Sequence, residues 1–315
     1  MPIDPDVRDF LEASSAAGLF PSVGDPRFVR TRYNGVAVPA MDGIWRIENI
    51  DIPSTSGSIR ARVYSPDDSG LLPAALLFHG GGWVIGDLLM AEAQSRQLAT
   101  RAGCRVVSID YRLAPDHPYP APIDDAYTAL EFVATEAARF GIDADRLAVY
   151  GQSAGGNLAA VVSLMTRDRG GPELALQVPV YPVIDADFCR PSYLEWGDGP
   201  GLTREQMEWF WDNYIGDGDR RAPYVSPIHA ESLAGVAPAL VITAEADPLC
   251  SEGRAYADRL RADGVPVTYS EYPGMHHGFI ALTQLFPKAA QALDEVVRAL
   301  RSAFRTDTAG DERQS

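Results

Sequence analysis

Short apolar runs alternate with helical stretches from about residue 74 onward. The apolar runs are Ala74–Phe78, Arg105–Ile109, Leu147–Tyr150, Leu176–Val183, Ala239–Thr243 and Val267–Tyr272. The helical stretches lie near Met90–Ala102, Ile123–Phe140, Ala154–Arg167, Cys250–Ala262 and Pro287–Phe304. Val- and Leu-rich strands separated by helices are typical of a parallel sheet that is covered on both faces. The pattern therefore predicts an α/β protein with a mostly parallel central sheet.

Two regions depart from this alternation. Residues 1–44 contain one weak amphipathic helix near Asp4–Ala17 and then a Pro/Gly-punctuated stretch, and residues 185–230 contain an aromatic helix around Glu205–Tyr214. We interpret the second region as an insertion that forms a cap over one end of the sheet. Between residues 45 and 304 we expect a single domain that starts with a β-hairpin, formed by Trp45–Pro53 and Ile59–Tyr64. The polar tail, 305–315, is predicted to be disordered.

The charge balance excludes several classes of partner. The 315 residues include 43 acidic and 27 basic side chains, which gives a net charge of −16. Nucleic acids and anionic membranes require Lys/Arg-rich surfaces, so neither is expected as a partner. The N-terminus carries acids where a signal peptide needs basic residues, and no apolar run approaches a membrane span. A cytoplasmic location is predicted.

The cysteines suggest neither a disulfide framework nor a metal site. Cys104, Cys189 and Cys250 are widely spaced and form no C-x-x-C motif. We interpret them as three reduced thiols, and neither a metal nor another cofactor is implied.

A G-x-S-x-G motif gives the first indication of chemistry. The segment Gly151-Gln152-Ser153-Ala154-Gly155 follows an apolar run and opens a helical stretch, which is the strand–turn–helix context that the motif requires. Glycines allow the sharp turn that exposes the serine, and the helix N-terminus behind it favours negative charge. Ser153 is the candidate nucleophile.

A glycine-rich loop follows an earlier apolar run. His79-Gly80-Gly81-Gly82-Trp83 comes directly after Ala74–Phe78. Three consecutive glycines are costly in conformational entropy. Their backbone N–H groups can approach a developing oxyanion closely because no side chains intervene. Upstream of G-x-S-x-G, the loop is therefore a candidate oxyanion hole.

A serine nucleophile needs a base, and the chain has five histidines. His79 belongs to the glycine loop, while His117 and His229 lie in turns or loops and are interpreted as structural. His276 and His277 follow the last predicted strand, where a hydrolase fold places its base. His277 is preferred because it directly precedes a Gly-Phe pair, and His276 stays the competitor.

The acid that orients the base should lie between the serine and the histidine in the chain. Asp247 follows the run Ala239–Thr243 and precedes a Pro-Leu pair. Asp185 follows the preceding strand and is the second candidate. Glu245 is a third, although it could point along the strand.

Together these motifs resemble the hormone-sensitive-lipase-like family of α/β-hydrolase carboxylesterases, in its bacterial esterase branch. The stretches that carry the resemblance are His79–Trp83, Asp110–Pro115 with Pro118 and Pro120, Gly151–Gly156, Thr243–Glu245, Asp247–Leu249 and His277–Phe279. Leu202-Thr203, Trp209–Trp211 and Ser226-Pro227 resemble the cap and post-cap segments of the family. The resemblance extends from about residue 45 to 300 and implies an α/β-hydrolase fold with a helical cap. It implies that residues 45–304 form the catalytic domain and that the cap is built from the N-terminal segment, 1–44, and the insertion at about 185–230.

The resemblance also implies roles for individual residues. Ser153 would be the nucleophile, His277 the base and Asp247 the acid. The N–H groups of Gly81, Gly82 and Ala154 would form the oxyanion hole. The implied substrate is a small ester with a short- to medium-length acyl chain. The family also contains many dimers, so a homodimer is compatible with the resemblance.

Two positions depart from the family pattern. Gln152 stands where the family usually has Asp, which removes a charge beside the nucleophile. Cys250 and Ser251 replace charged residues that often follow the Asp-Pro-Leu segment. Neither position belongs to the triad, so we expect catalysis to persist, with altered hydrogen bonding or pH dependence near Gln152.

Trp83, Trp209, Phe210 and Trp211 are candidates for the lining of an acyl or alcohol pocket, with packing in the core or cap as the alternative for each. Two other functions are kept open: an amidase or peptidase that uses the same triad, and a non-catalytic ligand receptor on the same fold. Such receptors tend to lose a triad member, whereas all three positions are filled here. An Asp nucleophile, as in the dehalogenases and epoxide hydrolases of this fold, is disfavoured by Ser153.

Overall fold

A computed structural model describes residues 3–18, 23–35, 43–199 and 201–305. Its centre is an eight-stranded sheet with the order β1-β2-β4-β3-β5-β6-β7-β8. The strands are β1 Arg46–Ser54, β2 Gly57–Ser65, β3 Leu72–Phe78, β4 Arg105–Asp110, β5 Ile142–Gln152, β6 Leu176–Val180, β7 Ala239–Ala246 and β8 Val267–His276. The hairpin β1–β2 is antiparallel and joins β4 in an antiparallel manner, and the remaining pairs are parallel.

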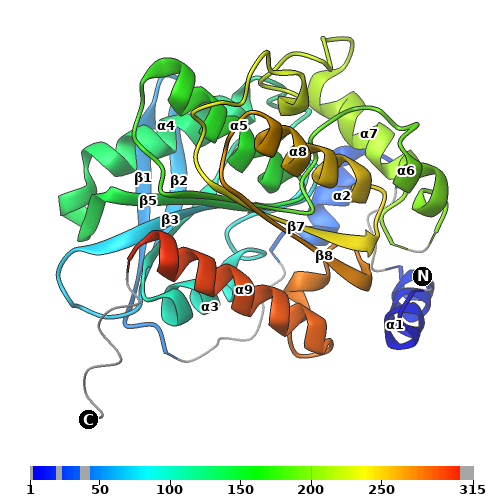
Figure 1. Cartoon of the computed structure of the whole chain (residues 1–315), viewed down its shortest axis with the longest axis horizontal. Helices are drawn as coiled ribbons and strands as arrows, with labels where there is room; N and C mark the ends of the chain where they lie inside the picture. Colours follow the sequence, from blue (N-terminus) through cyan, green and yellow to red (C-terminus); the bar gives the residue numbers. More distant parts are fainter. Residues whose placement is uncertain (1–2, 19–22, 36–42, 200, 306–315) are drawn as a thin grey trace.

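Helices cover both faces of the sheet, as predicted (Figure 1). On one face lie α3 Glu92–Ala102 and α9 Pro287–Ala303, and on the other lie α4 Ala121–Thr135, α5 Ala154–Arg169 and α8 Cys250–Ala262. Within β3, Leu76 and Phe78 pack into one hydrophobic cluster while Ala75 and Leu77 pack into the other. Successive side chains of a strand point to opposite faces, so an uninterrupted apolar run is what two covered faces require.

Four helices outside these two layers belong to the irregular regions. They are α1 Pro5–Ala16, α2 Pro26–Tyr33, α6 Pro191–Trp196 and α7 Arg204–Ile215. In Figure 1, α6 and α7 lie together near the ends of β7 and β8. The Arg30 guanidinium in α2 donates to the carbonyls of Val84 (3.0 Å) and Ala114 (2.7 Å), and the Trp209 indole N–H in α7 donates to the carbonyl of Gly24 (3.1 Å). These bonds join the N-terminal region to the residue that follows the glycine loop, to Ala114 and to the helix α7 of the insertion.

Some element boundaries differ from those predicted. The predicted strand over 176–183 ends at Val180, because Tyr181 has a positive φ of 34° that no strand accommodates. The predicted helix over 123–140 divides into α4 and a short 3₁₀ turn, Ala137–Phe140. The short helices α2 and α6 were not predicted; each has proline in its first turn.

Two further observations concern the ends of the chain and membranes. The tail predicted to be disordered, 305–315, lies outside the described residues except for Arg305. Among the helices that the structure describes, none has the length and apolarity needed to cross a bilayer.

Candidate active site

The serine lies at a strained turn between β5 and α5. Ser153 has φ 56° and ψ −120°, outside the allowed regions for a residue with a side chain. A Cβ at Gly151 would lie 2.0 Å from the Gly155 carbonyl oxygen, and one at Gly155 would lie 2.0 Å from that of Phe78. Only glycine therefore fits on either side of the serine, and the turn lifts the Ser153 side chain above the strand ends.

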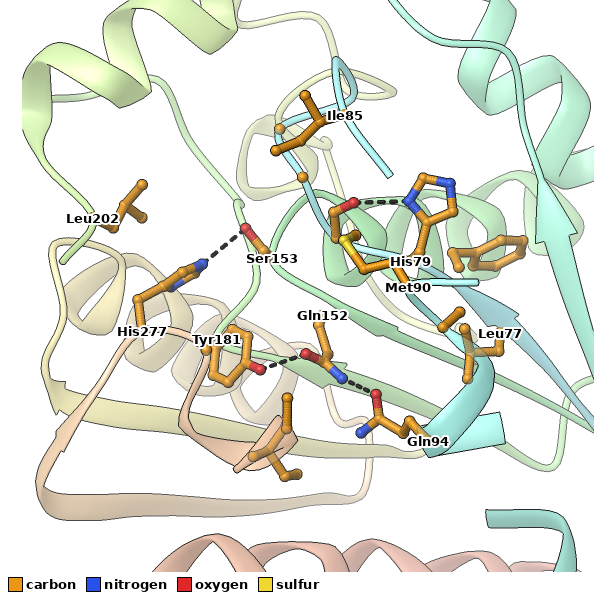
Figure 2. A pocket seen from close by; sticks show the side chains of 18 of the residues that line it. Leu77, His79, Ile85, Met90, Gln94, Gln152, Ser153, Tyr181, Leu202 and His277 are labelled. Carbon is orange, nitrogen blue, oxygen red and sulfur yellow. Dashed lines mark hydrogen bonds between the residues drawn. The ribbon is translucent and has the colours of Figure 1, made fainter. Parts of the chain in front are cut away.

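The structure brings Ser153, His277 and Asp247 into one hydrogen-bonded row. The Ser153 Oγ lies 3.0 Å from the His277 Nε2, and the His277 Nδ1 lies 2.7 Å from the Asp247 Oδ2 (Figure 2 shows the first contact). The Asp247 carboxylate is fully buried, and its Oδ1 accepts the Leu249 N–H at 2.9 Å. The acid follows β7 and the histidine follows β8, so the ends of neighbouring parallel strands hold the row together.

The competing histidines have other surroundings. His276 is buried, its ring stacks on Phe10 of α1 with centroids 5.7 Å apart, and burial lowers its pKa to about 4. The His79 ring stacks on Tyr111 (4.2 Å), and burial lowers the pKa of this histidine also. The His229 Nε2 pairs with an Asp185 oxygen at 3.0 Å.

The competing acids are likewise engaged elsewhere. Asp185 binds the Arg190 guanidinium at 2.5 Å, and Glu245 accepts the Gly274 N–H at 2.8 Å. Of the acids considered, Asp247 is the one that contacts His277.

The glycine loop lies directly beside the serine. A Cβ at Gly80 would be 3.6 Å from the Ser153 Cβ. Gly81 and Gly82 have positive φ values of 108° and 58°, and a Cβ at Gly82 would lie 2.1 Å from the Phe210 ring. Ala154 is the first residue of α5, so its N–H has no partner one turn earlier in the helix. Gly81 and Gly82 line the same cavity as Ser153, and Ala154 directly follows the serine.

A cavity of about 350 Å³ opens over the row. Its lining includes Ser153, His277, Gly80–Gly82, Leu77, Ile85, Met90, Gln94, Gln97, Gln152, Tyr181, Leu202, Gln206, Phe210 and Ile280 (Figure 2). Among the described residues, no Asp, Glu, Lys or Arg lines it. A cavity of this size and character accommodates a small uncharged molecule.

Of the four aromatic residues that were candidates for a pocket lining, Phe210 lines this cavity and the three tryptophans do not. Trp83 and Trp211 are fully buried, and the Trp83 ring stacks on Tyr214 with centroids 4.0 Å apart and meets Trp211 edge-on at 5.1 Å. Both tryptophans are therefore core residues: Trp211 belongs to α7, and Trp83 packs against the buried face of that helix. The Trp209 side chain binds the N-terminal region through Gly24 instead of lining the cavity.

Gln152 takes part in an uncharged polar cluster on the cavity floor. Its amide nitrogen donates to the Gln94 carbonyl oxygen and, at 3.1 Å, to the Tyr150 hydroxyl. Its carbonyl oxygen accepts the Tyr181 O–H at 2.5 Å (Figure 2). Sequence analysis missed Gln94 and Tyr181. The proline directly after Tyr181, near the end of a predicted strand, is the signal that could have drawn attention to Tyr181.

Comparison with known proteins agrees with this geometry. The model of a family described as alpha/beta hydrolase fold matches residues 75–281. The carboxylic ester hydrolase LipN of Mycobacterium tuberculosis is 39% identical over 95% of this chain and 83% of its own. The chain belongs to the α/β-hydrolase family. Its resemblance to the hormone-sensitive-lipase-like branch is confirmed.

Other α/β-hydrolases extend the comparison. The ethyl acetate hydrolase of Pseudomonas putida is 38% identical over 81% of this chain and 82% of its own. The crystal structure of a thermostable esterase from Pseudomonas putida superposes with a TM-score of 0.91 at 38% identity, covering 96% of this chain and 98% of that one. The fold prediction is therefore confirmed as well.

Proposed function

We propose that this chain is a serine carboxylesterase that hydrolyses small uncharged esters of short to medium acyl length. The observation that carries the proposal is the row of Ser153 Oγ, His277 Nε2 and Asp247 Oδ2, with contacts of 3.0 and 2.7 Å. The esterase relatives, at 38–42% identity, support the same class of reaction.

In the proposed mechanism, His277 takes the Ser153 proton while the oxygen attacks the ester carbonyl. The N–H groups of Gly81, Gly82 and Ala154 stabilise the oxyanion, and each such donor is worth roughly 3 kcal/mol in a hydrolase. His277 then protonates the leaving alcohol, and water repeats both steps on the acyl-enzyme. The buried Asp247 carboxylate holds the imidazole tautomer and stabilises the imidazolium.

We further propose that the helices of the two irregular regions form a cap over this cavity. Leu202 precedes α7, and Gln206 and Phe210 are part of it; all three line the cavity. The N-terminal region binds the carbonyl of Val84, directly after the glycine loop, through Arg30 and contacts α7 through Trp209. A cytoplasmic location and a homodimer are additional proposals, tested by cell fractionation and by light scattering of the purified protein.

The decisive experiment compares the wild type with Ser153→Ala on a series of p-nitrophenyl esters from acetate to decanoate. We expect the variant to lose at least about 1000-fold in kcat/KM. A fluorophosphonate should label the wild type and leave the variant unlabelled. Ester hydrolysis near the wild-type rate in Ser153→Ala would refute the proposed mechanism. A matched series of anilides tests whether amides are better substrates than esters.

A further inference from the structure

The segment after β6 wraps around the nucleophile. The Val180 carbonyl accepts the Ser153 N–H at 2.9 Å, and the Val183 N–H donates to the Ser153 carbonyl at 3.2 Å. Tyr181 lies between these two bonds. The backbone that fixes the serine turn therefore also fixes the position of the Tyr181 side chain.

Tyr181 has a backbone conformation that is rare for a residue with a side chain. Its φ is 34°, and its N–H donates to the Ile242 carbonyl at 2.6 Å, which holds the conformation. Positive φ at a bulky buried residue persists only where the surroundings fix it, and such residues cluster at functional sites. Relaxing Tyr181 into β6 would move its ring away from the cavity.

The Tyr181 side chain lies between the proposed base and Gln152 (Figure 2). Its ring centroid is 4.7 Å from that of His277, with the planes tilted by 57°. Its hydroxyl donates to the Gln152 carbonyl oxygen at 2.5 Å. The Tyr181 ring is fully buried, so no water competes for this contact.

The amide of Gln152 is oriented for this role. Its two N–H donors bind the Gln94 carbonyl oxygen and the Tyr150 hydroxyl. With both donors engaged, the carbonyl oxygen points to Tyr181. A carboxylate at residue 152 would have no proton to donate to the Gln94 carbonyl oxygen or to the Tyr150 hydroxyl, so both of these contacts require the amide of Gln152.

We propose that Tyr181 is a positioning residue for the His277 imidazole and that Gln152 anchors it. Asp247 holds the His277 Nδ1 through one hydrogen bond of 2.7 Å, which fixes one edge of the ring and does not by itself prevent the ring from tilting. The Tyr181 ring limits this tilt on one side and helps to keep Nε2 at 3.0 Å from the Ser153 Oγ. The inference rests on the proposed function, in which His277 is the base.

Positioning of the base predicts a specific kinetic pattern. His277 acts in both acylation and deacylation, so a displaced imidazole slows both steps together. When both rate constants fall by the same factor, kcat falls and KM stays constant. Loss of a substrate contact would instead raise KM.

The test is a double-mutant cycle of Tyr181→Phe and Gln152→Met, measured on p-nitrophenyl butyrate. Each variant removes one partner of the same hydrogen bond and keeps a side chain of similar volume. The matched control is Tyr256→Phe, which removes the bond from another buried tyrosine to a glutamine, Gln177, at 3.0 Å and outside the cavity. Rates are expressed per competent site, counted by the end point of fluorophosphonate labelling.

We expect each single variant to lower kcat about fivefold with KM unchanged, as the loss of one hydrogen bond implies. The double variant should also lose about fivefold, because both changes break the same bond. Tyr256→Phe should keep the wild-type kcat. The pH profile of kcat/KM should keep its midpoint in both single variants, because neither change alters a charge.

Three results would overturn the inference: wild-type rates in both single variants, an increase in KM at constant kcat, or losses that multiply in the double variant. Ser153→Ala, assayed alongside, separates this failure from failure of the proposed function. If Ser153→Ala is inactive and the Tyr181 and Gln152 variants behave as the wild type, only the positioning role is wrong. If Ser153→Ala hydrolyses the ester, the proposed function itself fails.

Discussion

Replacing His276 by phenylalanine should make the protein more resistant to acid while leaving its activity at neutral pH intact. Burial lowers the pKa of this histidine to about 4 from its ordinary value of 6.5. Because the folded-state pKa lies below the unfolded one, the stability contributed by neutral His276 is complete above pH 6.5 and is lost as the pH falls toward 4. The shift corresponds to about 3 kcal/mol at pH 4 and about 2.5 kcal/mol at pH 4.5.

The assay is urea unfolding, followed by tryptophan fluorescence, at pH 7.0 and pH 4.5. The quantity to compare is the difference in unfolding free energy between His276→Phe and the wild type at each pH. The contributions of the other titrating groups are the same in both proteins and cancel in this difference. Phenylalanine retains a ring to stack on Phe10 and to meet Phe286 edge-on. We expect the difference to move by about 2.5 kcal/mol in favour of the variant on going to pH 4.5.

The control is His117→Gln, which changes an exposed histidine and should show the same difference at both pH values. The reasoning is refuted if the difference for His276→Phe stays constant within about 0.5 kcal/mol, because a buried neutral histidine must contribute this linkage. Esterase activity of His276→Phe at pH 7.5 should stay within about twofold of the wild type, because His277 is the histidine that contacts Ser153. Loss of activity would return His276 to candidacy as the base.

Three further experiments test the consequences of close packing and burial. Gly82→Ala places a methyl group 2.1 Å from the Phe210 ring and should abolish ester hydrolysis. Its control is Gly103→Ala, at a similar φ of 65° but with no atom near the new methyl group. This control should lower the unfolding free energy by about 1 kcal/mol, measured by thermal unfolding, and leave kcat unchanged. Burial raises the pKa of the Cys250 thiol to about 12, so iodoacetamide at pH 8 should modify exposed Cys189 and spare Cys250 in mass spectra of tryptic peptides. Burial also raises the pKa of Glu252 well above its usual range, so at pH 7 Glu252→Gln should change the unfolding free energy by less than about 1 kcal/mol.

The central sheet and the turn that carries Ser153 were predictable because they depend on local sequence patterns. Apolar runs separated by helical stretches predict parallel strands, and a serine between two glycines after such a run predicts a sharp turn. Chain order restricted the acid to residues between Ser153 and His277 and left Asp185 and Glu245 open beside Asp247, so the family resemblance was needed to favour Asp247 and His277. Their proximity requires only that β7 and β8 are neighbouring parallel strands, as they are in the structure.

The cavity lining was far less predictable, because it depends on which helices pass over the strand ends. Gln94 reaches the floor only because β3 pairs with both β4 and β5, which brings the first turn of α3 beside residue 152. The aromatic run of α7 was noted, but its buried members alternate between the core, as Trp211 does, and the cavity, as Phe210 does. A helical face of that width cannot be divided from sequence alone.

The placement of His277 has a consequence for how the protein is made. His277 directly follows β8, which forms one edge of the sheet. In the sequence, His277 comes 124 residues after Ser153 and 30 residues after Asp247. During synthesis, Ser153 and Asp247 are therefore both present in the chain before His277, the proposed base, has been added. The hydrogen-bonded row of Ser153, His277 and Asp247 can therefore form only after β8 has been synthesised and has paired with β7.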